Sequence, residues 1–283
     1  MEQEGNRVGM EKRVLIIGEH SYIGNAFVQY VMLQENENSE LQLRIEKVSA
    51  RNNQWKNTDF SQYDTILHVA AIVHQKETKD KQQLYIDVNQ KLPVEVAKKA
   101  KEEGVNQFIF LSTMAVYGEV EGAITKDTPL NPTTMYGKTK LAAERKLARL
   151  ADENFRVSIL RPPMVYGEKC PGNYSRLKKL AKVLPVFPNV DNKRGMVHVD
   201  TLCRCIKSEM EREAGGGQVL ILHPQDKNPV KTTALYVKLR SDMGKKTYTT
   251  KIFNGLISGL KGKIGVVNKL FGSCYYAECV ERF

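Results

Sequence analysis

Arg13-Val-Leu-Ile-Ile17-Gly18-Glu-His-Ser-Tyr-Ile-Gly24 is the stretch of this chain that decides its fold. The apolar run that begins at Val14 predicts a buried strand, and the residues after the turn, to about Asn36, have the pattern of an amphipathic helix. A strand that passes through a glycine turn into a helix presents the free N–H groups of the helix terminus to an anion. This arrangement receives the pyrophosphate of a dinucleotide.

The residues of this turn have separate tasks. Gly18 permits the tight turn, and Gly24 lets the helix approach the strand. The usual spacing places a third glycine at position 21, where this chain has Ser21, which carries a Cβ but still offers its N–H and a hydroxyl. We therefore expect phosphate binding to survive, with Ser21, Tyr22 and Ile23 among the cofactor-binding residues.

Strands and helices alternate along the first 160 residues, which predicts an α/β fold of Rossmann type: a doubly wound parallel sheet with helices on both faces. The predicted strands cover 13–17, 43–49, 65–69, 107–111 and 156–160, and the predicted helices cover 22–36, 84–103 and 135–153. After Arg161 five prolines mark a change in composition and indicate a smaller, substrate-binding lobe. We expect the Rossmann domain to comprise 11–161 plus about 195–222, and the lobe about 162–194 and 223–283.

Tyr136-Gly-Lys-Thr-Lys140 places a tyrosine and a lysine on one face of a helix, because residues four apart are neighbours there. A nearby ammonium lowers the pKa of a phenol from its ordinary value of about 10, and the phenol then exchanges protons near neutral pH. Such a pair in isolation is more often a surface tyrosine beside a solvated lysine. Ser112 and Thr113, at the end of the predicted strand Phe108–Leu111, favour a functional site, because open α/β sheets bind their ligands at the carboxyl ends of strands.

The chain resembles the extended short-chain dehydrogenases/reductases of the NAD-dependent epimerase/dehydratase family, whose members act mainly on nucleotide sugars. Eight motifs occur in family order and span most of the chain. They are the glycine turn 18–24, Thr58-Asp59-Phe60, His68-Val-Ala-Ala71, Asn89, Ser112-Thr113 with Val116-Tyr-Gly118, Tyr136 with Lys140, Arg161-Pro-Pro-Met-Val-Tyr-Gly167, and Arg194-Gly-Met-Val-His-Val-Asp200.

The resemblance implies a role for each matching residue. Tyr136 would be the acid/base at the sugar oxygen, Lys140 would hold the nicotinamide ribose and lower the tyrosine's pKa, and Thr113 would hydrogen-bond to the same oxygen. The cofactor would also contact Asp59 at the adenine amino group, Phe60 beside the adenine ring, Ala70, Ala71, Ser112 and Pro162. The substrate would contact Thr113, Met114, Asn173 and Arg194, the last at the diphosphate. Structural alternatives exist: a strand-end hydroxyl for Thr113, a turn residue for Asp59 and a surface charge for Arg194.

The end of the second strand bears on the choice of cofactor. An acidic residue there would bind the ribose 2′-hydroxyl of NAD, whereas a basic or small polar residue would admit the NADP phosphate. Ser49 and Arg51 fall near this point. The sequence thus favours NADP slightly over NAD and leaves both open.

Two departures from family patterns narrow the reaction. Sugar dehydratases of the family carry Asp-Glu directly after the threonine, and this chain has Met114-Ala115, which cannot serve as acid and base. Met164 stands where many hexose epimerases have an asparagine, so relatives that reduce or epimerise C4 of amino- or deoxy-sugar nucleotides are the better match. We expect an NAD(P)-dependent 4-epimerase or 4-ketoreductase of a UDP-linked sugar. Two alternatives are a non-catalytic dinucleotide-binding regulator and a reductase of a steroid or phenolic carbonyl.

Composition sets further bounds. The net charge is +11, but no helix-turn-helix, zinc finger or RNA-binding aromatic motif appears, so no nucleic-acid partner is expected. The segment Lys251–Gly265 mixes apolar and basic residues, which raises membrane-surface contact as a minor possibility that its four glycines weaken. Five unevenly spaced cysteines indicate reduced thiols and a cytoplasmic location. His68 and His74 lack metal-ligand spacing, so no metal is expected. The resemblance implies a homodimer formed through the helices near 84–103 and 135–153.

Overall fold

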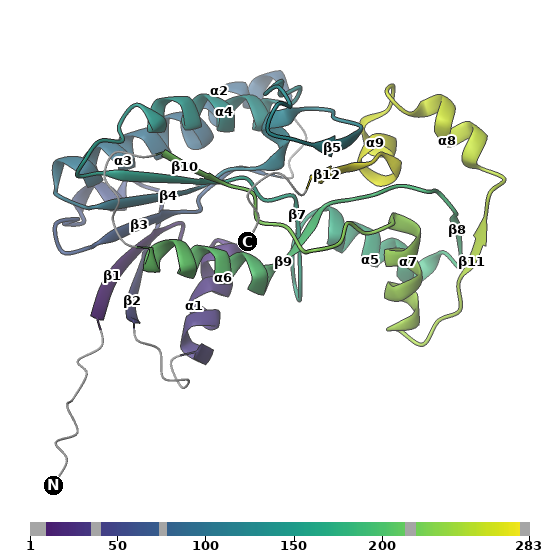
Figure 1. The fold of residues 1–283 in the computed structure, drawn as a ribbon, viewed down its shortest axis with the longest axis horizontal. Helices are drawn as coiled ribbons and strands as arrows, with labels where there is room; N and C mark the ends of the chain where they lie inside the picture. The colour runs from purple at the N-terminus through teal and green to yellow at the C-terminus, as the bar shows by residue number, and fades with distance from the viewer. Residues whose placement is uncertain (1–9, 35–40, 74–77, 213–218, 278–283) are drawn as a thin grey trace, which may run out of the picture.

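Six parallel strands form the central sheet of the computed structural model, which describes residues 10–34, 41–73, 78–212 and 219–277 (Figure 1). Their order across the sheet is β10-β6-β4-β3-β1-β2. The strands are β1 (Met10–Ile17), β2 (Leu41–Val48), β3 (Thr65–His68), β4 (Gln107–Leu111), β6 (Arg156–Leu160) and β10 (Val219–Leu222). The order reverses between β1 and β3, and a reversal of this kind opens a crevice at the carboxyl ends of the strands.

Helices cover both faces of the sheet because side chains alternate along each strand. Val14 and Ile16 of β1 pack in a core with α1 (Tyr22–Gln34) and α6 (Val199–Glu211). Leu15 packs on the opposite face in a second core with α3 (Leu92–Glu102) and α4 (Met135–Ala148). The predicted α/β fold with a doubly wound parallel sheet is confirmed.

The helix predicted over 84–103 is interrupted. It comprises α2 (Gln82–Tyr85), a π-helical stretch η3 (Ile86–Lys91) and α3 (Leu92–Glu102). Pro93 has no N–H to donate to the carbonyl four residues earlier, so regular α-helical bonding cannot run through this point. The wider π turn carries Asn89, which is fully buried and faces the loop after β3.

The lobe is built from short elements on one side of the sheet (Figure 1). It has its own core, in which the rings of Phe187 and Tyr236 stack with centroids 3.9 Å apart. The elements that contribute to this core are α5 (Asn173–Val183), β8 (Val186–Pro188), α7 (Thr232–Ser241), α8 (Asn254–Leu260) and α9 (Gly265–Phe271). The other short elements are η1 (Gln54–Asn57), η2 (Lys79–Lys81), η4 (Met114–Tyr117), β5 (Gly122–Ile124), β7 (Met164–Tyr166), β9 (Met196–His198), β11 (Tyr248–Thr250) and β12 (Cys274–Tyr276).

Within the described residues, no helix has both the length and the apolar character needed to cross a membrane. The four described cysteines, at positions 170, 203, 205 and 274, form no disulfide. No group of three potential metal ligands lies together in the described ranges. His74 lies outside those ranges.

Candidate active site

The glycine turn joins β1 to α1 as the sequence predicts. Gly18 has φ +126°, a conformation that side chains rarely allow, and a Cβ at this position would lie 3.0 Å from the backbone nitrogen of Ala70. A Cβ on Gly24 would lie 3.2 Å from Ile16, so this glycine brings α1 close to the sheet. The first N–H groups of a helix have no intrahelical partner, and those of α1 start directly after the turn. The turn thus leaves the N–H groups at the start of α1 available to an anion, and its binding of a pyrophosphate stays a prediction.

The three predicted cofactor residues after Gly18 differ in their surroundings. The backbone N–H of Ser21 donates to the carbonyl of Gly18 over 2.9 Å, which closes the turn. Ile23 packs into the core beneath α1. The hydroxyl of Tyr22 donates to the carbonyl of Glu168 over 2.9 Å, so this side chain reaches across to the loop after β7. The ring of Tyr22 thereby fixes the loop after β7 against the start of α1.

Ser49 and Arg51, which the sequence predicts to contact the cofactor, follow the end of β2 at Val48. The N–H of Gly18 donates to the carbonyl of Val48 over 3.0 Å, which places Ser49 next to the glycine turn. The backbone N–H of Arg51 donates to Ser49 Oγ over 3.2 Å, and the side chain of Arg51 is exposed. Both residues thus lie beside the glycine turn, and their contact with the adenosine ribose stays a prediction.

Asp59 and Phe60 point in opposite directions. The carboxylate of Asp59 is exposed and accepts hydrogen bonds from the hydroxyl and the N–H of Ser61, which hold its pKa below the ordinary value. The side chain of Phe60 is fully buried in the core beneath the sheet, with the ammonium of Lys99 over its ring at 4.9 Å. The side chain of Phe60 thus packs into the core, whereas the resemblance implied a place beside the adenine ring.

Ala70 and Ala71 follow β3, and their backbone is held in place. The N–H of Ala70 donates to the carbonyl of Ile17 over 3.0 Å. The amide of Asn89 bonds to both backbone groups of Ile72, at 2.8 and 3.0 Å. Asn89 therefore fixes the loop opposite the glycine turn, a structural task that its place among the family matches did not specify.

Thr113 and Tyr136 meet at the carboxyl edge of the sheet, where their side chains share a hydrogen bond. Thr113 follows β4, and its hydroxyl also accepts from the N–H of Ala115 over 3.1 Å. Tyr136 lies in the first turn of α4, which Thr134 caps by accepting from the N–H of Gly137 over 3.1 Å. A Cβ on Gly137 would lie 2.6 Å from the carbonyl oxygen of Ala115, so this glycine lets α4 approach the loop that carries Thr113.

Burial raises the pKa of Tyr136 to about 12, against the opposing effect of the hydrogen bond with Thr113. The Lys140 ammonium donates to the carbonyl of Leu111 over 2.8 Å and lies 4.3 Å from the centre of the Phe110 ring. Desolvation lowers the pKa of Lys140 to about 7. The expectation that Lys140 lowers the pKa of Tyr136 does not hold for this structure, because the ammonium is directed under the sheet edge.

A buried polar network lies behind these residues, and the sequence analysis did not identify it. The guanidinium of Arg161 forms a two-pronged ion pair with Glu144, with an N–O distance of 2.7 Å, and donates to the hydroxyl of Tyr117 over 2.9 Å. Ser112 also bonds to Glu144, so its hydroxyl faces the network rather than the crevice. Glu144 lies four residues after Lys140 on the same face of α4, a spacing that could have revealed it.

Two further predicted residues, Pro162 and Met114, lie between Thr113 and the lobe. The carbonyl of the buried Pro162 accepts from the N–H of Met114 over 2.9 Å. The sulfur of Met114 lies 3.6 Å from that of Cys274, and Cys274 is bridged to Arg194 through the backbone. Met114 thus lies between Thr113 and the residues predicted to bind the substrate diphosphate.

Asn173 and Arg194 line one cavity, together with Met164 and Lys269. Burial lowers the pKa of Arg194, and its Nε has no hydrogen-bond partner among the described residues. The cavity volume is about 20 Å³, room for a water molecule and too little for a diphosphate. Binding of a substrate phosphate here would therefore require the lobe side chains to move apart.

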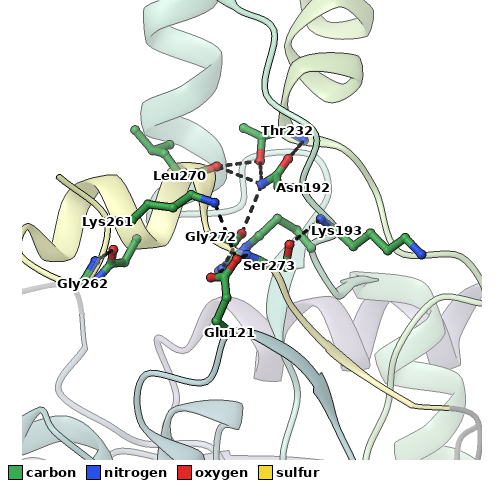
Figure 2. A network of polar contacts seen from close by, with 11 residues as sticks. Glu121, Asn192, Lys193, Thr232, Lys261, Gly262, Leu270, Gly272 and Ser273 are labelled. Atoms are coloured by element: carbon green, nitrogen blue, oxygen red, sulfur yellow. Dashed lines mark hydrogen bonds and ion pairs between the residues drawn. The ribbon is translucent and has the colours of Figure 1, made fainter. Parts of the chain in front are cut away.

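One wall of the cavity is held by the network in Figure 2. The amide of Asn192 donates to the hydroxyl of Thr232 over 2.9 Å and to the carbonyl of Gly272 over 3.1 Å. The carboxylate of Glu121 accepts from the N–H of Ser273 over 3.1 Å and pairs with Lys261 at 3.5 Å. These contacts tie α9 and β12 to the lobe and to the edge of the Rossmann domain. They fix the position of the segment that carries Lys269.

Comparisons with known proteins agree with this architecture. Residues 14–221 match the model of the NAD dependent epimerase/dehydratase family. The chain is 27% identical to a UDP-glucose 4-epimerase from Vibrio cholerae, over 93% of this chain and 87% of that protein. It is 26% identical to an N-acetyl-alpha-D-glucosaminyl-diphospho-ditrans,octacis-undecaprenol 4-epimerase from Escherichia coli O157:H7, over 84% of this chain and 74% of that protein. The fold is similar to that of UDP-glucuronic acid 4-epimerase from Bacillus cereus in complex with NAD, with a TM-score of 0.66, 23% identity, and coverage of 84% and 87% of the two chains.

Proposed function

The chain belongs to the NAD dependent epimerase/dehydratase family, and on that premise we propose that it catalyses 4-epimerisation of a UDP-linked sugar. The observation that carries the proposal is the hydrogen-bonded pair of Thr113 and Tyr136 at the sheet edge, with Lys140 one helical turn away. The two relatives compared by sequence are both named as 4-epimerases. The substrate of one is a UDP sugar and that of the other a lipid-linked diphospho sugar, and both substrates carry a diphosphate, which Arg194 and Lys269 suit by charge.

Each of the site residues would have its own role at C4 of the sugar. A bound nicotinamide dinucleotide would supply the hydride chemistry. Tyr136 would exchange a proton with the C4 oxygen, and Thr113 would hold that oxygen by a hydrogen bond. Lys140 would turn from the Leu111 carbonyl toward the phenol and the cofactor ribose, which would favour the ionised phenol. The glycine turn and Asp59 would fix the cofactor at its pyrophosphate and adenine.

A 4-ketoreductase is the second candidate, and two observations favour it. Met164 lines the cavity where many hexose epimerases have an asparagine. Ser49 and Arg51 lie where they could admit the 2′-phosphate of NADP, the reductant that a reductase consumes. Both reactions use the same Tyr136 chemistry, and they differ in whether the cofactor is oxidised stoichiometrically.

The test uses purified protein with UDP-hexoses and catalytic NAD, and separately with a 4-keto nucleotide sugar and NADPH. Formation of the C4 epimer without net change in nicotinamide absorbance supports the epimerase, whereas loss of NADPH absorbance in step with ketone supports the reductase. Turnover in neither assay contradicts the proposal.

We expect Tyr136→Phe to lower kcat by roughly 10²–10⁴-fold, because the phenylalanine cannot transfer the proton. Cofactor affinity, measured by fluorescence titration, should stay within a few fold. Tyr248→Phe, at an exposed site on the lobe, is the matched control and should leave kcat unchanged. Equal kcat for wild type and Tyr136→Phe would remove Tyr136 from the reaction.

A further inference from the structure

The outer end of the lobe is formed by β8, β11 and α8 (Figure 1). These elements and their flanking residues expose a group of large apolar side chains. Ile252 is 86% exposed and Leu256 is 65% exposed, and several such side chains grouped on one surface mark an interaction site. We call this surface the lobe tip. Its apolar members are Val186, Tyr248, Ile252, Phe253, Leu256 and Ile264.

Contacts join β8, β11 and the start of α8 at the lobe tip. Tyr248 and Val186 are register partners in the parallel pair of β11 and β8, and partners on neighbouring strands point to the same face. The amide of Asn254, at the start of α8, donates to the carbonyl of Asn189 just after β8, over 2.9 Å. Ile257 of α8 is buried in the lobe core while its neighbour Leu256 is exposed. The short helix is therefore anchored on one side and presents its other side outward.

Basic residues predominate around the lobe tip, where Glu121 pairs with Lys261 at 3.5 Å. The segment Met243–Gly272 contains six lysines and no aspartate or glutamate. The neighbouring helix α5 contains one arginine and three lysines and again no acidic residue. The ammonium of Lys245 donates to the carbonyl of Lys182 over 2.6 Å, which joins the two basic segments, and Lys182, Lys251 and Lys263 are exposed.

We propose that the lobe tip docks on an anionic lipid bilayer, with the apolar side chains in the interface and the lysines among the headgroups. Apolar and aromatic side chains surrounded by lysines are the combination that binds such a surface. A second copy of this chain is a poor occupant, because self-association through this face would bring two sets of lysines together. A small anion would not account for the apolar side chains.

Docking would place the substrate cavity next to the membrane. The segment Lys261–Ile264 leads from α8 directly into α9, and Lys269 and Leu270 of α9 line the cavity. The network around Asn192 and Glu121 holds α9 in place, so the lobe tip and the cavity are mechanically connected. The proposal concerns binding to lipid alone and stands apart from the reaction that the enzyme catalyses.

The experiment is sedimentation of the purified full chain with phosphatidylcholine vesicles and with vesicles that contain phosphatidylglycerol. We expect binding to the anionic vesicles only, and release at high salt, because screening shortens the reach of the lysines. Lys251→Glu with Lys263→Glu should lower the partition coefficient at least about 25-fold, since one lysine contributes about fivefold at an anionic surface. Ile252→Ser with Phe253→Ser and Leu256→Ser should lower it at least about tenfold.

Matched controls lie elsewhere on the molecule. Met32→Ser with Leu33→Ser removes two exposed apolar side chains from the end of α1, and Lys98→Glu reverses an exposed charge on α3. These variants should bind as the wild type does, and circular dichroism of every variant shows whether its fold is intact. No binding to anionic vesicles, or equal losses in the control variants, would overturn the proposal. A concentration-dependent dimer that the lobe-tip variants dissociate would also overturn it, because the surface would then be a contact between copies.

Discussion

The state of Tyr136 in this structure is that of an acid rather than a base. With a pKa of about 12, only about one phenol in 10⁵ is ionised at pH 7. In the proposed reaction, removal of a proton from the sugar hydroxyl would therefore require a positive charge near the phenol. Two charges are available to the site: the ammonium of Lys140 and the oxidised nicotinamide of a bound cofactor.

We predict that binding of oxidised cofactor lowers the pKa of Tyr136 by one unit or more. The sign follows from charge, because a nearby cation stabilises the phenolate over the phenol. The measurement is the tyrosinate absorbance of wild type minus that of Tyr136→Phe, titrated with and without NAD. In Lys140→Met the shift should be smaller, and an unchanged pKa in wild type would contradict the proposed activation.

We infer that single residues after β2 set the choice between NAD and NADP. We predict that Arg51→Ser weakens NADP about 10–100-fold and NAD much less, because a charge-assisted hydrogen bond to the 2′-phosphate is lost. The dissociation constants come from fluorescence titration with each cofactor. Arg44→Ser, on β2 and paired with Glu11 at 2.8 Å, is the control and should leave both constants unchanged. Equal losses for the two cofactors in Arg51→Ser would show that Arg51 does not read the phosphate.

At the scale of elements, the turn between β1 and α1 depends on glycine for two separate reasons. Gly18 combines φ +126° with backbone only 3.0 Å from the place a Cβ would take. We predict that Gly18→Ala lowers the free energy of unfolding by about 2 kcal/mol and weakens cofactor binding at least tenfold. The backbone strain of roughly 1–2 kcal/mol at this φ is added to the steric clash between the new Cβ and the backbone of Ala70. Urea unfolding and cofactor titration measure the two effects.

Gly104 is a control that has the positive φ of Gly18 without its close backbone contact. It has φ +83° but no atom within 4 Å of the point that a Cβ would occupy, so Gly104→Ala should cost only the strain of about 1 kcal/mol and leave cofactor affinity unchanged. If Gly18→Ala behaves as Gly104→Ala does, contact with Ala70 is unimportant for the site.

The sequence predicted the elements whose signal is local. The strand over 107–111 and the strand over 156–160 match β4 and β6, because a continuous apolar run is typical of a strand buried on both faces. The helix break at η3 was missed although Pro93 is visible in the sequence, because a proline near the middle of a long helical pattern also fits a kinked helix. The π turn also carries Asn89, whose contact with Ile72 is tertiary and has no local signal in the sequence.

The structure brings some of the predicted site residues together, and the surroundings of others differ from those expected. Tyr136 and Thr113 were expected to meet, and the structure brings them together. The direction of the Lys140 side chain and the burial of Phe60 were not expected, because both depend on which neighbours fill the space around them. The network of Glu144 and Arg161 was missed for the same reason: its partners come from segments far apart in the sequence.

Over the whole molecule, two buried histidines link stability to pH. His68 is fully buried beside Phe108 and Phe110, where desolvation, aided by the charge of Lys140, lowers its pKa to about 3. Desolvation and the charge of Arg161 lower the pKa of His223 to about 4. An unfolded histidine binds a proton near pH 6.5, so between about pH 6.5 and 4 the unfolded chain takes up more protons than the folded one.

We therefore predict that the free energy of unfolding is independent of these histidines above about pH 6.5 and falls as the pH drops below it. The limiting slope is about 1.4 kcal/mol per pH unit for each histidine. Urea unfolding at pH values from 7.5 to about 4.5 measures this slope, and His68→Leu should reduce it by about half. His20→Gln, at an exposed position, is the control and should leave it unchanged. If His68→Leu leaves the slope unaltered, His68 does not stay neutral in the folded core, and its burial does not contribute to the loss of stability in acid.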